Sequence, residues 1–82
     1  MDENRLMMKG RLEELRRDQK KWRHKAKMLL RDMAKTLNPA LRDVEDMEVA
    51  DAAMIMDELV MAQAELLGLR TRIRELEEAL YG

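Results

Sequence analysis

Apolar residues recur in heptads through both halves of this chain, and a single proline separates the two runs. The first run lies within residues 3–37, and the second extends from residue 52 to residue 80 without a polar exception. Alternating spacings of 3 and 4 are typical of long helices that pack along one seam. Proline lacks a backbone N–H donor and disfavours helical geometry at the residue before it, so Asn38-Pro39 ends the first run. The sequence therefore predicts two long helices joined by a connector.

The predicted fold is all-α, an antiparallel helical hairpin with a coiled-coil-like seam in one domain, residues 1–82. The expected helices span residues 3–37 and 47–81, residues 38–46 form the connector, and Asp43 or Asp46 is expected to cap the second helix. Gln19 occupies a seam position where a polar residue can fix the register. The predicted core consists of the large seam residues Leu12, Leu15, Trp22, Leu29, Met33, Ile55, Leu59, Leu66, Leu69, Ile73, Leu76 and Leu80.

Charge divides at the proline, and its pattern distinguishes two registers for the hairpin. Residues 1–38 carry twelve Lys/Arg against six Asp/Glu, and residues 39–82 carry four against eleven. In an antiparallel hairpin, the numbers of two residues that face each other add up to a constant, which identifies the register. A tight reversal at Pro39 would make this sum about 78 and bring like charges together. A connector over residues 38–46 raises the sum to about 84, which places residues 70–74 opposite the acidic pair Glu13 and Glu14 and residues 57–65 opposite the basic run 16–27. The sequence predicts the second register, with opposite charges interlocked.

A second apolar stripe flanks the seam and has no partner within a two-helix hairpin. Met56, Val60 and Leu67 carry it on the second helix, and Leu30 and Leu37 occupy comparable positions on the first. One partner helix cannot cover a helix that is apolar around more than half of its circumference. We therefore expect a homodimer, in which two hairpins form a four-helix bundle with the stripe as the dimer contact.

Composition argues against enzymatic chemistry. The chain contains no Cys and no Ser, and its single histidine, His24, has no carboxylate positioned near it along the helix. These absences remove the commonest nucleophiles and the usual metal-binding spacings. We expect no catalytic residues, no metal site and no cofactor. The N-terminus resembles no secretion signal and no apolar run reaches the length of a membrane span, so a cytoplasmic protein without a membrane partner is expected.

Four cations on the first helix supply the alternative hypothesis. Arg16, Lys20, Arg23 and Lys27 share one helical face at spacings of 4, 3 and 4 and are candidate phosphate contacts. They favour a nucleic-acid-binding accessory protein that uses residues 16–27. The main interpretation is a solvated face on a self-associating hairpin module, which acts as a structural, adapter or regulatory protein and contacts a second copy or another protein.

Overall fold

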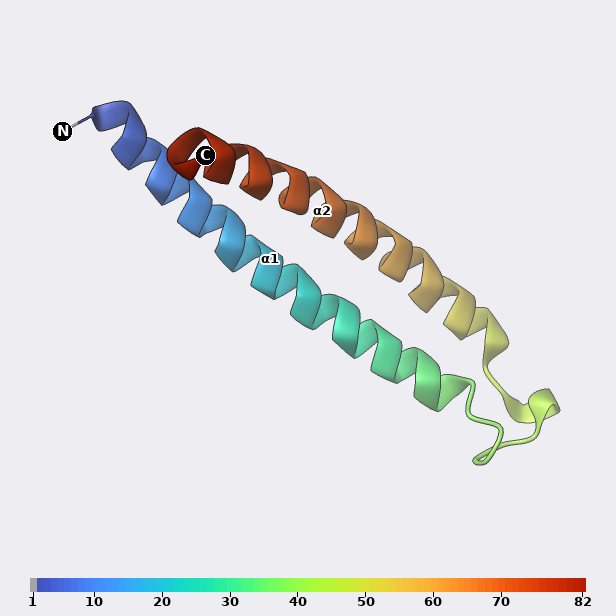
Figure 1. Ribbon diagram of the computed structural model, residues 1–82. Helices are drawn as coiled ribbons and strands as arrows, with labels where there is room; N and C mark the ends of the chain where they lie inside the picture. The colour runs from blue at the N-terminus through green and yellow to red at the C-terminus, as the bar shows by residue number, and fades with distance from the viewer. Residues whose placement is uncertain (1) are drawn as a thin grey trace.

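The computed structural model describes residues 2–82, which form two long antiparallel helices side by side (Figure 1). Helix α1 spans Glu3–Thr36 and helix α2 spans Val49–Tyr81, with a short 3-10 helix, η1, at Val44–Asp46 between them. The molecule measures 64 × 17 × 15 Å. Residues 2–82 contain no strand, and the prediction of an all-α helical hairpin is confirmed.

The ends of α1 follow from local capping. The Asp2 carboxylate accepts a hydrogen bond from the backbone N–H of Asn4 at 3.0 Å and so satisfies one of the free donors of the first turn. The helix ends at Thr36, one residue before the predicted end. Just beyond it, the Asn38 side-chain oxygen accepts a hydrogen bond from the N–H of Ala40 at 2.9 Å. Asn38 therefore starts a turn that carries the chain past Pro39.

The connector is longer than expected because α2 begins at Val49 rather than at residue 47. The N–H of Asp46 donates to the carbonyl of Asp43 at 3.0 Å, which closes the short η1 turn. Met47 then adopts an extended conformation and separates this turn from α2. Neither Asp43 nor Asp46 caps α2, whose N-cap residue is Glu48, so that expectation was wrong.

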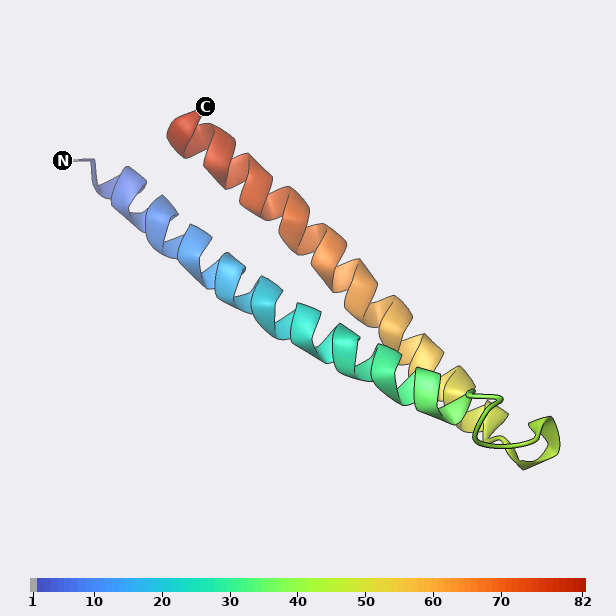
Figure 2. The ribbon, with the colours of Figure 1, turned by 60° about the horizontal axis from the view of Figure 1, so that its bottom comes forward.

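The seam residues lie where the two helices meet. Each seam position from Met8 to Met33 and from Ala52 to Leu80 is buried or half-buried, and Leu15 and Ala62 are at most 1% exposed. The helices are inclined to each other, since they converge near the termini in Figure 1 and near the connector in Figure 2. A small inclination of this kind is common between helices that pack along an apolar seam. The fully buried residues are Leu12, Leu15, Leu29, Ala52, Ala62, Leu69, Ile73 and Leu80.

The register differs from the predicted one by about one heptad. Residues 16–23 line one cleft together with residues 70–77, and the Arg16–Glu77 pair there gives residue numbers that sum to 93. Nearer the termini the long Arg5 side chain lies over the ring of Tyr81, and this pair sums to 86, close to the predicted value. The first turns of α1 extend past the end of α2, which leaves Leu6 and Met7 exposed (Figure 1). A shift by one heptad keeps seam residues opposite seam residues, whereas exposed ion pairs contribute under about 1 kcal/mol each. Charge interlocking was therefore too weak a criterion to select the register.

Candidate interaction surface

One side of the hairpin carries both the second apolar stripe and most of the candidate phosphate contacts. Along α2, the residues next to the seam are apolar in the N-terminal half and basic in the C-terminal half. Along α1 the order is reversed, with basic residues first and apolar residues after them. Because the helices are antiparallel, the apolar residues of both lie toward the connector and the basic residues of both lie toward the termini. We call this side the flank face. It comprises Arg16, Lys20, Arg23, Lys27, Leu30, Ala53, Met56, Val60, Gln63, Leu67, Arg70 and Arg74.

The half of the flank face near the connector is apolar and open to solvent. The predicted dimer contacts Met56, Val60 and Leu67 are 46%, 58% and 50% exposed, and Leu30 of α1 is 52% exposed. We call these four residues the apolar stripe. A groove of about 350 Å³ lies beside it. The groove is lined by Ala26, Leu30, Met56, Leu59, Val60, Gln63 and Leu66.

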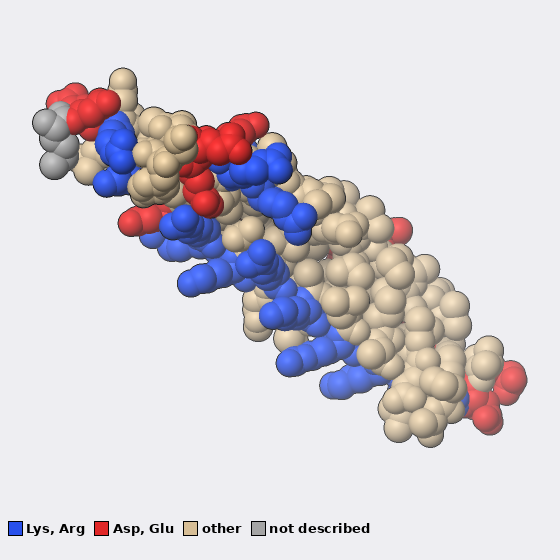
Figure 3. All heavy atoms as spheres, in the orientation of Figure 1, with Lys and Arg blue, Asp and Glu red and all other residues tan. Residues whose placement is uncertain are grey.

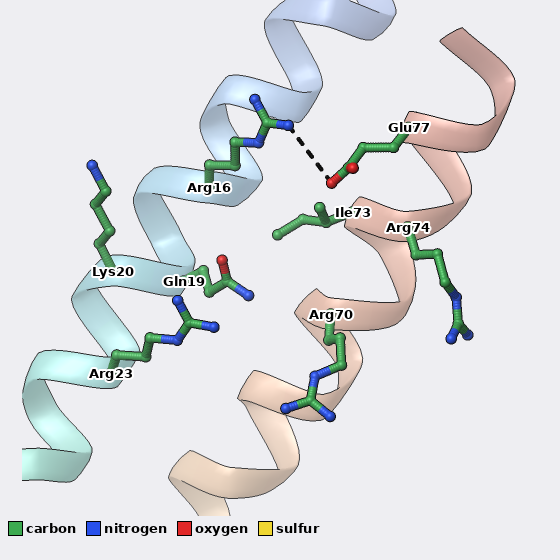
Figure 4. A pocket seen from close by; sticks show the side chains of 8 residues that line it. All are labelled: Arg16, Gln19, Lys20, Arg23, Arg70, Ile73, Arg74 and Glu77. Carbon is green, nitrogen blue, oxygen red and sulfur yellow. Dashed lines mark ion pairs between the residues drawn. The ribbon is translucent and has the colours of Figure 1, made fainter. Parts of the chain in front are cut away.

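The half nearer the termini is basic. We call its five cationic residues the cation cluster: Arg16, Lys20 and Arg23 from α1, and Arg70 and Arg74 from α2. With Gln19, Ile73 and Glu77 they line a cleft of about 390 Å³ between the helices. Figure 4 shows Gln19 and Ile73 in the gap, Lys20 pointing away from α2, and Arg74 pointing away from α1. In Figure 3 the Lys and Arg side chains gather along α1 nearly as far as the connector, while the surface over the neighbouring part of α2 is largely uncharged.

The charge of the cluster is nearly uncompensated within the hairpin. Among residues 2–82 only two ion pairs form, Arg11 with Glu14 at 3.0 Å and Arg16 with Glu77 at 3.6 Å. Glu77 is the single carboxylate that lines the cleft, so the five cations and Glu77 carry a formal charge of +4. The predicted pairing of residues 70–74 with Glu13 and Glu14 does not occur. The one-heptad shift brings Arg70 and Arg74 beside cations of α1 instead.

Sequence reasoning found part of this cluster and missed the rest. Arg16, Lys20 and Arg23 line the cleft as one group, whereas Lys27 is exposed and lies outside its lining. Arg70 and Arg74 were not singled out, because the predicted register assigned them acidic neighbours. Their spacing held the signal, since they follow Leu67 at steps of 3 and 4 and so continue the line of the apolar stripe.

The rest of the described chain offers little reactive chemistry. His24 is exposed, and no group of three or more His, Cys, Asp or Glu within residues 2–82 is placed to hold a metal ion. Trp22 is half-buried at the seam, and the Lys25 ammonium lies 5.1 Å from the centre of its ring. Neither described helix combines the length and apolar character needed to cross a membrane. The flank face is thus the feature of this structure best suited to binding.

Comparisons with protein-family models, curated proteins and solved structures found no match to this chain.

Proposed function

We propose that this chain is a non-enzymatic, self-associating helical hairpin, a structural or adapter module whose apolar stripe packs on a second copy to form a four-helix bundle. The observation that supports the proposal is the stripe itself. Four large apolar side chains from both helices are about half exposed on one side of the hairpin, and three of them border the groove. Isolated exposed apolar residues are ordinary, but a group of them around a groove is typical of an interface.

Size also supports self-association. A chain of 82 residues with a single seam buries little apolar surface, and domains this small commonly gain stability from oligomerisation. Packing two hairpins through their stripes would cover Met56, Val60 and Leu67 of each copy at once. Such an interface is isologous, because the same residues contribute from both sides.

The test compares two variants at neighbouring positions of α2. Val60 lies in the stripe and is 58% exposed, whereas Met61 is 69% exposed and lies about 100° round the helix. Val60→Lys and Met61→Lys add the same charge at two sites that are both more than half exposed. Sedimentation equilibrium is expected to give a dimer mass for the unmodified protein and for Met61→Lys, and a monomer mass for Val60→Lys with its helical circular dichroism retained.

Two results would contradict the proposal. A monomer mass for the unmodified protein at high micromolar concentration would show that the stripe does not bind a second copy. Equal weakening by both substitutions would show that the stripe is not the contact surface.

A further inference from the structure

The cation cluster faces solvent with little compensating charge, and the chain carries a segment of opposite charge elsewhere. Residues 43–51 contain five carboxylates and no Lys or Arg, and we call this segment the acidic connector. Its five acidic side chains are exposed, and none of them forms an ion pair among residues 2–82. The acidic connector lies at one end of the hairpin, whereas the cluster lies midway along α1 and toward the C-terminal part of α2 (Figure 1), and no connector residue lines the basic cleft.

Spacing along the helices places cluster and connector symmetrically about the apolar stripe. On α2 the stripe is centred near Val60, and the cluster residues Arg70 and Arg74 lie about 12 residues further on, ~18 Å at 1.5 Å per residue. The same step in the other direction reaches Glu48, within the acidic connector. A two-fold axis through the centre of the stripe would therefore carry the connector of one copy onto the cluster of the other.

Charge distinguishes the two symmetric ways to stack a pair of flank faces. A two-fold axis along the hairpin gives a parallel pair and places one cation cluster directly on the other. A two-fold axis across the hairpin gives an antiparallel pair and places each cluster on an acidic connector. Both arrangements bury the stripe, but the first opposes two groups of +4 and the second pairs opposite charges at both ends.

We infer that the two hairpins pack antiparallel through their flank faces, so that the acidic connector of each copy contacts the cation cluster of the other. This inference rests on the self-association proposed above. Arg side chains suit this contact because a guanidinium group can bind a carboxylate through two hydrogen bonds.

The area of this contact depends on how far it extends from the two-fold axis. The contact reaches about 18 Å to each side of the axis on a face 17 Å wide, roughly 600 Å² in projection, against the roughly 800 Å² that a standard interface buries on each partner. The apolar stripe occupies only part of that length, so a stable dimer must also use the charged ends. In the antiparallel arrangement those ends attract each other instead of repelling.

Cross-linking through introduced cysteines tests the orientation directly, because the chain has no cysteine of its own. Arg23→Cys places a thiol in the cluster, Glu45→Cys places one in the connector, and Glu78→Cys is a control near the C-terminus. Each pair of variants is mixed and treated with a short bis-maleimide. We expect a cross-linked dimer from Arg23→Cys with Glu45→Cys, and none from Arg23→Cys alone or from Arg23→Cys with Glu78→Cys.

The possible outcomes distinguish failure of the antiparallel arrangement from failure of self-association itself. A dimer that cross-links through Arg23→Cys alone would be parallel, which would overturn the inference and leave self-association standing. A dimer that cross-links in neither combination would overturn it as well. A monomeric unmodified protein would overturn both.

A second measurement addresses the charges. Replacing Asp43, Glu45, Asp46 and Glu48 by their amides is expected to weaken dimerisation about tenfold at low salt and to leave the helical content unchanged. Unchanged dimerisation, together with salt-sensitive binding of a short DNA duplex by the unmodified dimer, would instead make the cluster a phosphate site and overturn the inference.

Discussion

The two halves of the flank face occupy equivalent positions beside the same seam, yet they have opposite character. Toward the connector the face is apolar, with Leu30 and Val60 about half exposed, and toward the termini it is basic, with Arg23 and Arg70 on the two helices. Buried seam residues lie beneath both halves. Under the proposed function the two features have separate roles: the seam forms the hairpin, and the flank face binds a second copy.

Within the flank face, the two halves would contribute differently to binding. A uniformly apolar face would give affinity without orientation, because parallel and antiparallel stacking would bury the same side chains. The basic half adds a charge that only one of these orientations compensates. Charged ends on an apolar interface commonly supply specificity and faster association more than affinity. The predictions below test whether seam and face are separable in this way.

The largest change in the free energy of unfolding is expected when a seam leucine, rather than a flank-face leucine, is replaced by alanine. Leu15 is 1% exposed beneath the basic half, and Leu15→Ala should lower the free energy of unfolding by about 3 kcal/mol, through lost burial and the cavity left behind. Leu30→Ala, at a half-exposed site on the same helix, should lower it by less than about 1 kcal/mol in dilute protein. Urea denaturation followed by circular dichroism measures both. Similar losses would mean that seam and flank face do not have separate roles.

The sequence was sufficient for the fold and insufficient for the register. The heptads and Pro39 predicted two helices, and the observed ends differ from the predicted ones by at most two residues. A heptad repeat is unchanged by a shift of one heptad, so it cannot set the register alone. The charges chosen to decide it are exposed and weak, since even the Arg16 and Glu77 side chains are about half exposed.

The error in register concealed the most distinctive feature of the surface. Residues 70–74 were assigned to acidic partners, so the cation cluster could not be foreseen from α2. The apolar stripe needed no register, because its residues follow from the helical period of each helix separately. Features confined to one helix were thus predictable here, while a feature shared by two helices required the structure.

Replacing either of the two glycines within the helices is expected to stabilise the hairpin, by less than the leucine truncation destabilises it. A Cβ atom at Gly10 would meet no atom within 4 Å, and one at Gly68 would meet only the Arg72 guanidinium at 3.5 Å. Ala at either site should raise the free energy of unfolding by about 0.5–1 kcal/mol, because glycine disfavours a helix. Neither residue lies on the flank face, so the dimer dissociation constant should not change. Weaker dimerisation of Gly10→Ala or Gly68→Ala would place the interface at the glycines instead.

The smallest change in stability is expected at Glu77, the single carboxylate that lines the basic cleft. Replacing it should make the hairpin slightly less stable and the dimer tighter. Glu77→Gln removes the ion pair with Arg16, whose atoms are 3.6 Å apart, and should lower the free energy of unfolding by no more than about 0.5 kcal/mol. It also raises the charge of the cluster from +4 to +5, so an acidic connector should bind it more tightly. Glu75→Gln, an exposed change away from the cleft, is the matched control for both measurements. A dimer weakened by Glu77→Gln and not by Glu75→Gln would show that the basic half does not bind the acidic connector of a second copy.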